Sequence, residues 1–123
     1  MERRDWASTS QDPVVTDPML YRLIFENDRV RVLEYRDQPG DRTHLHRQPD
    51  TVMVPLSSFH RRISDGDRLV EVAIDAGTVR WVGAQEHRGE NIGTTETHAI
   101  FIELKEPGRS ADVGAALGPA RQS

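Results

Sequence analysis

The sequence contains no cysteine, which excludes disulfide bonds, a thiolate nucleophile and cysteine-based metal sites. It also has no run of apolar residues long enough to cross a bilayer. The segment Met1–Trp6 lacks the apolar stretch of a signal peptide, so the cytoplasm is the default location that we expect. Any bound metal ion would have to be held by histidine, carboxylate, amide or water.

A large excess of charge of either sign is missing as well. The formal net charge is −4 over 123 residues, and this weak acidity offers nothing to draw the protein to nucleic acid or to an anionic membrane. Hydrophobic residues make up 36% and charged residues 29%, a balance typical of one soluble globular domain. The composition therefore argues against nucleic acid and anionic membranes as partners.

Helical periodicity of useful length is missing, and short β-rich runs alternate with turns such as Asp37–Gly40 and Ser64–Asp67. Residues 83–91 are predicted to form a loop, and we expect Val79 and Trp81 to be buried together. We predict strands at residues 19–25, 29–36, 44–48, 51–56, 59–63, 69–74, 78–82 and 97–105. This regular spacing predicts an all-β sandwich or barrel with little helix.

Residues 19–106 are predicted to form the folded domain. Residues 1–18 are polar and carry two prolines, so we expect a flexible N-terminal arm. Residues 107–123 are rich in glycine, alanine and serine, which predicts a flexible C-terminal tail. The arginines of residues 29–36 are expected to lie on a solvated strand face. No internal repeat or second domain is visible.

Three of the five histidines fall in two short stretches, residues 39–50 and residues 87–91. Successive side chains of a strand point to opposite faces, so His44, His46 and Gln48 would share one face. His87 would reach the same point from a second strand or turn. Converging imidazoles are a common arrangement for transition metals, although histidines can also cluster by chance.

The spacing of these residues resembles that of small single-domain bacterial cupins. Gly40 is followed by five residues and then by His46, with the next ligand position at Gln48. Gly77 leads into a second motif that contains His87 and then Asn91. The resemblance covers roughly residues 20–106 and implies a double-stranded β-helix, a jelly-roll barrel of two antiparallel sheets. In that family pattern His46 and His87 are the two retained ligand positions.

The sequence also departs from the cupin pattern. Gln48 replaces the second histidine of the first motif, no glutamate stands at the usual place after it, and Asp50 is the nearest carboxylate. Two ligand sets therefore remain open: His46, Gln48 and His87, or His44, His46 and His87. The resemblance implies one divalent transition metal (Fe, Zn, Ni, Mn or Cu), with a metal-free pocket as the alternative. A third arrangement would use Asp50 or His98.

The resemblance implies a metal-dependent enzyme of the oxygenase, isomerase or lyase type, acting on a small organic molecule in the barrel cavity. His46 and Gln48 are the candidate catalytic residues, and Gln48 would orient substrate or water. One alternative is a non-catalytic cupin that binds a small ligand or acts as an accessory protein. Another is metal-free acid/base catalysis by His46, with Glu86 or Glu90 as the acid partner.

A homodimer is expected because small barrels leave strand edges exposed, and pairing with a second subunit hides them. The N-terminal segment would be suited to that exchange.

Overall fold

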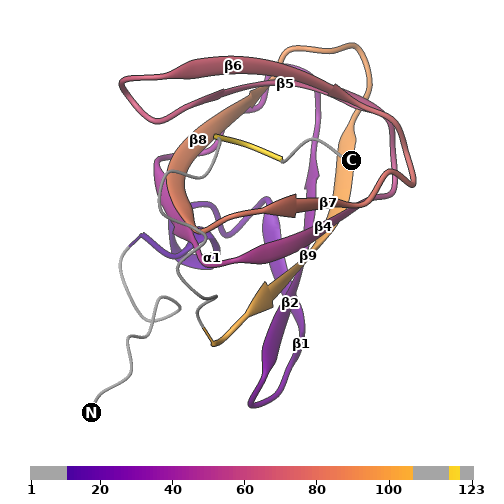
Figure 1. The fold of residues 1–123 in the computed structure, drawn as a ribbon. Coiled ribbons are helices and arrows are strands. Elements are labelled where there is room, and N and C mark those ends of the chain that lie inside the picture. The colour runs from indigo at the N-terminus through magenta and orange to yellow at the C-terminus, as the bar shows by residue number, and fades with distance from the viewer. Residues whose placement is uncertain (1–10, 107–116, 120–123) are drawn as a thin grey trace.

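The computed structural model describes residues 11–106 and 117–119. Its strands form two antiparallel sheets that face each other across a shared interior (Figure 1). Within the described residues the helical part is a single turn, α1 (Pro13–Thr16). The predicted all-β architecture with little helix is therefore confirmed.

The larger sheet has five strands in the order β1-β2-β9-β4-β7. Their bounds are β1 Tyr21–Glu26, β2 Val30–Asp37, β9 Thr97–Leu104, β4 Thr51–Pro55 and β7 Arg80–Val82. The smaller sheet has four strands in the order β3-β8-β5-β6. Their bounds are β3 His46–Gln48, β8 Gln85–Asn91, β5 Phe59–Ser64 and β6 Leu69–Ile74.

Alternation of side chains along each strand builds the core between the sheets. In β2 every second residue is buried, beginning with Arg31, while the residues between them lie on the outer face. Two apolar clusters fill the interior and share Phe101 as a neighbour. Their buried members are Met53, Phe59, Ile74, Val82 and Ala99 in one cluster, and Tyr21, Leu33 and Tyr35 in the other.

The packed part of the chain begins before residue 19. Asp12 caps α1 by accepting the backbone N–H of Val14 at 3.0 Å, and its carboxylate binds the guanidinium of Arg31 through two contacts of 2.8 Å. Arg31 also donates to Glu103 at 2.9 Å. The expectation of a solvated arginine is thus wrong for Arg31, because its strand position faces inward. Residues 1–10 of the predicted arm lie outside the described residues.

The segment predicted as a loop, residues 83–91, contains strand β8, which pairs with β3 on one side and β5 on the other. The sequence of β8 is polar throughout and lacks the apolar alternation by which a strand is predicted, which is why it predicts a loop. The expected burial of Val79 and Trp81 is also wrong, since both are exposed. Trp81 pairs with Val52 of β4, and the side chains of Trp81 and Val52 lie on the outer face of the larger sheet.

A short piece of the predicted C-terminal tail packs against the smaller sheet. Leu117 is buried, and the backbone N–H of Gly118 donates to Oε1 of Gln85 at 2.8 Å. This segment, yellow in Figure 1, runs beside β8. Residues 107–116 and 120–123 lie outside the described residues.

Candidate functional site

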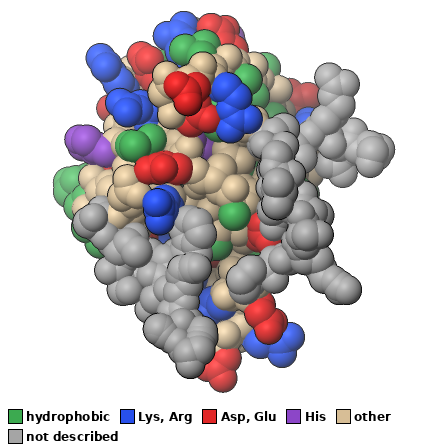
Figure 2. All heavy atoms as spheres, turned by 60° about the vertical axis from the view of Figure 1, so that its left-hand side comes forward, with side chains coloured by type: hydrophobic (Ala, Val, Ile, Leu, Met, Phe, Trp, Pro, Cys, Tyr) green, Lys and Arg blue, Asp and Glu red, His purple; other side chains and the backbone are tan. Residues whose placement is uncertain are grey.

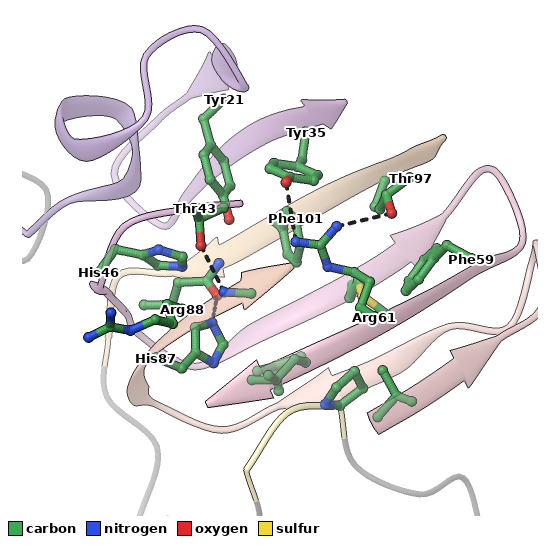
Figure 3. A pocket seen from close by; sticks show the side chains of 18 residues that line it. Tyr21, Tyr35, Thr43, His46, Phe59, Arg61, His87, Arg88, Thr97 and Phe101 are labelled. Atoms are coloured by element: carbon green, nitrogen blue, oxygen red, sulfur yellow. Dashed lines mark hydrogen bonds between the residues drawn. The ribbon is translucent and has the colours of Figure 1, made fainter. Parts of the chain in front are cut away.

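A cavity of about 50 Å³ lies between the two sheets. By this measure one water needs about 10–15 Å³, so the cavity has room for a few waters or one small organic molecule. Most of its wall is apolar, and besides Thr43 and Arg88 the wall has two groups of polar side chains. His46, Gln48 and His87 form one group, while Tyr35, Arg61 and Thr97 form the other (Figure 3).

His46 and His87 lie directly opposite each other in neighbouring strands. They are Cα partners in the antiparallel pairing of β3 with β8. Their ring centroids are 4.9 Å apart and the ring planes meet at 89°, so one edge points at the other face. The structure thus brings together the two histidines that the motif spacing singled out.

The imidazole of His46 presents a bare nitrogen to the cavity. Its Nδ1 lies 2.9 Å from the carbonyl oxygen of His44, which can only accept, so Nδ1 carries the proton and donates it. Nε2 is buried and has no partner among the described residues. Burial lowers the pKa of His46, so the ring stays neutral near pH 7 and Nε2 remains an acceptor.

His87 donates its proton away from the cavity. Burial first, and then the nearby His46, lower the pKa of His87 to about 3, so its ring carries a single N–H. Nδ1 lies 2.7 Å from Oε1 of Gln85, an oxygen that also accepts from the backbone N–H of Gly118. Since Gln85 donates its own amide N–H to the carbonyl of Gly83, that oxygen is fixed and His87 donates to it.

Nε2 of His87 is then an acceptor, and the amide of Gln48 must supply its donor. The Gln48 amide oxygen is placed 3.0 Å from this nitrogen, and the amide nitrogen is buried without a partner. A half rotation of the amide exchanges the two atoms and gives both nitrogens a partner. The amide oxygen of Gln48 then takes the unpartnered position, so the free polar atoms of this group are two acceptors.

His44 lies outside the cavity, so the expectation that it shares a face with His46 and Gln48 is wrong. Strand β3 begins at His46, and the chain before it is not extended as a strand. The side chain of His44 is 79% exposed, and Nδ1 binds the carboxylate of Asp17 at 2.9 Å. The ligand set His44, His46 and His87 is therefore not assembled.

Four other candidates also lie away from the cavity. The carboxylate of Asp50 accepts the backbone N–H of Ala84 at 2.9 Å, and Glu86 accepts from Gln11 at 2.7 Å. His98 points to the outer face of the larger sheet, where Nε2 lies 2.7 Å from Glu34. Glu90 lies 3.6 Å from the guanidinium of Arg62. None of these four side chains lines the cavity.

Sequence reasoning missed the buried charge at the other end of the cavity. The Arg61 guanidinium donates to the carboxylate of Asp37 at 2.6 Å and to Thr97 at 3.1 Å, and it stacks 5.2 Å from the ring centroid of Tyr35. Asp37 also accepts from the Tyr35 hydroxyl, and from the side-chain amide of Asn91 at 3.0 Å. The Arg61 charge is thus already neutralised within the wall.

The alternation of side chains along β5 could have predicted that Arg61 is buried. Phe59, Arg61 and Ile63 alternate along β5 with two exposed or half-exposed residues, so they share the buried face. The run His60-Arg61-Arg62 resembles a solvated strand when it is read by composition alone. An arginine between two apolar residues of the same parity indicates a buried cation that needs a buried carboxylate.

The solved structures of known proteins place this fold. A cupin domain from Bordetella pertussis Tohama I superposes with a TM-score of 0.66 and 28% identity, covering 71% of this chain and 93% of that chain. The chain is a small cupin. The cupin is also similar to an RmlC-like cupin with a double-stranded β-helix from Methanocaldococcus jannaschii (TM-score 0.59, 10% identity, 72% of this chain and 81% of that one).

A further structure, titled a predicted oxalate decarboxylase, comes from Thermotoga maritima. It matches the cupin with a TM-score of 0.50 and 19% identity, over 68% of this chain and 78% of that one, and this likeness concerns the fold alone. No protein-family model matches the sequence, and no curated protein does so either. No helix among the described residues is long and apolar enough to span a membrane.

The donor set of this cupin does not fit a tightly held divalent metal. Two imidazoles and one amide reach the cavity, and the described residues contain no group of three or more histidine, cysteine or carboxylate side chains arranged to hold an ion. Nε2 of His87 is engaged by Gln48. A catalytic zinc site commonly uses three imidazoles, or two with a carboxylate, and neither combination is present at this end of the cavity.

Charged side chains on the outside follow no single sign. On the face that Figure 2 shows, acidic and basic side chains lie next to one another. Elsewhere on the surface, Arg62 pairs with Glu71 across β5 and β6 at 3.2 Å, and Arg68 pairs with Asp65 at 2.8 Å within the turn that joins these strands. An arrangement of this kind gives little long-range steering of a charged ligand.

Proposed function

We propose that this cupin binds a small, uncharged organic molecule in its cavity without a metal ion. The observation that carries the proposal is the buried, unpartnered Nε2 of His46, beside an amide of Gln48 that also has one atom without a partner. Buried polar atoms in proteins are nearly always hydrogen-bonded. Nε2 of His46 and the free amide atom of Gln48 would therefore bond to a molecule that enters the cavity. This is the alternative function that the sequence left open.

The chemistry of the ligand follows from the free atoms. Nε2 of His46 and the amide oxygen of Gln48 both accept, so the ligand brings hydroxyl or N–H donors. A carboxylate would meet two acceptors here, and the buried Arg61 is already neutralised by Asp37. Arg88 also lines the cavity, but it is exposed and its guanidinium points away from the two acceptors (Figure 3). The apolar remainder of the wall suits a short hydrocarbon body. A small alcohol, diol or primary amide has these properties.

Among the described residues that line the cavity there is no strong base, which favours binding over acid/base catalysis. Burial lowers the pKa of His46, and the positive charge of Arg61 lowers it further. A general base works best when its pKa lies near the operating pH. His46 therefore accepts hydrogen bonds well but takes up a proton poorly. Glu86 and Glu90, which the sequence suggested as acid partners of His46, do not line the cavity.

The test combines elemental analysis with ligand binding. Protein purified without an affinity tag and treated with a chelator is expected to hold substoichiometric metal. It should still bind small alcohols, diols or amides, as followed by NMR shifts of the His46 and His87 rings. His46→Leu is expected to abolish binding, whereas His44→Ala, outside the cavity, is the matched control and should retain it.

Two results would overturn the proposal. Near-stoichiometric metal that disappears in the His46→Ala/His87→Ala double variant would restore the metal-dependent enzyme. Binding that survives His46→Leu unchanged would place the ligand elsewhere.

A further inference from the structure

The hydroxyl of Tyr21 is a further polar group of the cavity, besides His46 and Gln48, that has no partner. Tyr21 is the first residue of β1, and its ring belongs to the apolar cluster that also contains Leu33 and Tyr35. The residue is buried and lines the cavity, and Figure 3 shows its hydroxyl pointing away from β1 into the interior. Within the described part of the chain this hydroxyl forms no hydrogen bond.

Aromatic neighbours hold the ring of Tyr21 in place. The ring centroids of Tyr21 and His46 are 5.7 Å apart, and the ring planes meet at 72°. The rings of Tyr35 and Phe101 also pack against Tyr21, with centroids at 4.7 Å and 6.0 Å. Packing and not a hydrogen bond therefore positions the hydroxyl, so it stays available to a molecule in the cavity.

The Tyr21 hydroxyl differs from the other two free groups because it can donate. Burial raises the pKa of Tyr21 well above its ordinary value, so the hydroxyl keeps its hydrogen at neutral pH. Nε2 of His46 and the amide oxygen of Gln48 only accept. Thr43 also lines the cavity and accepts the backbone N–H of Gly89 at 2.9 Å, and its own hydrogen adds a further donor but no charge.

The two acceptors are spaced to share one NH₂ group. His46 and Gln48 are two positions apart in β3, so their side chains leave the strand on one face, about 6.6 Å apart. The hydrogens of a planar NH₂ group point about 120° apart, so two acceptors bonded to it at about 2.9 Å stand about 5 Å from each other. Side chains that converge slightly from β3 meet this spacing.

We propose that the ligand of this cavity is a short primary carboxamide held by Tyr21, His46 and Gln48. This assignment rests on the proposed function and narrows its ligand class. The two amide hydrogens bond to Nε2 of His46 and to the amide oxygen of Gln48, and the ligand's carbonyl oxygen accepts from Tyr21. The acyl carbons lie against the apolar wall, to which Met53 and Phe101 contribute.

The other uncharged ligands match this pattern less well. A simple alcohol has one hydrogen for two acceptors. A short diol supplies two hydrogens, but it is polar at both ends and leaves little carbon for the apolar wall. It also loses rotation about its central bond on binding, whereas the amide group is already planar and rigid. A ketone has no hydrogen to donate.

The size of the cavity limits the length of the acyl group. Its volume is about 50 Å³, and a water takes about 10–15 Å³ by the same measure, so about four non-hydrogen atoms fit. Acetamide has four such atoms, and so do acetone, 2-propanol, ethylene glycol and acetate. These five compounds have nearly the same size and differ in their donors, acceptors and charge, so they form a matched series.

NMR titration of the chelator-treated protein with the five compounds tests the assignment, with the ring resonances of His46 and His87 as the readout. Acetamide is expected to bind in the millimolar range, about tenfold more tightly than acetone, 2-propanol or ethylene glycol. Acetate is expected to cause no shift, because it adds a negative charge and donates no hydrogen at neutral pH.

Tyr21→Phe keeps the ring and removes only the hydroxyl. It is expected to weaken acetamide binding about tenfold, because the carbonyl oxygen loses its donor in a buried site. Thr95→Val is the matched control and should leave acetamide binding unchanged. It removes a hydroxyl outside the cavity, which bonds to the carbonyl of Ser58 at 3.0 Å. Circular dichroism checks that both variants keep the wild-type fold, and the ranking of the five compounds in the wild type does not depend on either variant.

The outcomes separate this assignment from the proposed function. If 2-propanol or ethylene glycol binds as tightly as acetamide and loses its binding in His46→Leu, the carboxamide assignment is overturned and the proposed function stands. Acetone that binds as tightly as acetamide, or folded Tyr21→Phe with unchanged acetamide affinity, overturns the assignment equally. If no compound of the series shifts the ring resonances, both the assignment and the proposed function are overturned.

Discussion

The guanidinium of Arg61 lies where a side chain at Gly89 would begin. A Cβ built on Gly89 would stand 2.8 Å from Nη2 of Arg61, closer than real contacts of this kind. Gly89 has an ordinary backbone conformation, so a glycine is needed here because Arg61 approaches its backbone closely and not because of an unusual turn. Strand β8 therefore gives room to the buried cation that closes one end of the cavity.

Gly89→Ala is expected to lower the free energy of unfolding by about 1–3 kcal/mol, the usual cost of overpacking an interior site. The physical reason is displacement of a guanidinium that Asp37 and Thr97 hold in place. Urea denaturation measures the change. In an Arg61→Met background the same substitution should cost less, since the clashing atom is gone, and a cost that is unchanged in this double-mutant cycle would contradict the explanation.

Asp37 is expected to be the most sensitive position of the buried network. Asp37→Asn leaves the Arg61 charge without its counter-charge in the interior, so the free energy of unfolding should fall by about 3–5 kcal/mol. Asp67→Asn, in the exposed turn before β6, is the matched control and should change it little. Chemical denaturation of both variants at neutral pH gives the comparison. Equal stability of the two would show that the Asp37 charge contributes nothing.

Stability is expected to fall with pH below about 6.5 through the buried histidines. The pKa of His87 drops from its ordinary value of 6.5 to about 3 in the folded protein, mainly through burial, and the pKa of His46 is lowered as well. Between pH 6.5 and about 3 the unfolded chain binds a proton at His87 that the folded chain does not. Unfolding is therefore favoured as pH falls, by at most about 1.4 kcal/mol per pH unit for this group.

Urea titrations at several pH values check this slope. In His87→Gln the free energy of unfolding should depend less on pH in the same window. His60→Gln, which removes a histidine that is partly exposed on β5, is the control variant. Carboxylates contribute equally to the wild type and to the variants, so the difference between the curves isolates His87.

Gln48→His is expected to create the metal site that the cupin lacks. The new imidazole would join His46 and His87 on neighbouring strands and complete a set of three, with room for a fourth ligand. Affinity for Zn²⁺ or Co²⁺ should rise by about tenfold or more, which corresponds to about 1.4 kcal/mol. Isothermal titration calorimetry against the wild type and His44→Ala tests it. Equal affinity in the wild type and Gln48→His would show that the cavity geometry, not the amide, prevents metal binding.

The sequence by itself determined most of the fold. Turns at Asp37–Gly40 and Ser64–Asp67 and the alternation of Val70, Val72 and Ile74 predicted strands that the structure contains. The two motif histidines, His46 and His87, lie together as their spacing predicted, although their role stays a prediction. These features are local, because strand alternation and turn chemistry depend on residues close in the chain.

Only the tertiary structure decided which polar residues face the cavity. His44 and His46 are two positions apart, yet a strand that starts at His46 leaves His44 on the outside with Asp17. Arg61 faces inward because Asp37, on a strand of the other sheet, lies within 2.6 Å of it. The same holds for Phe25 and Trp81, which are exposed at opposite edges of one sheet. Pairing between distant strands sets these neighbours, and no local pattern records it.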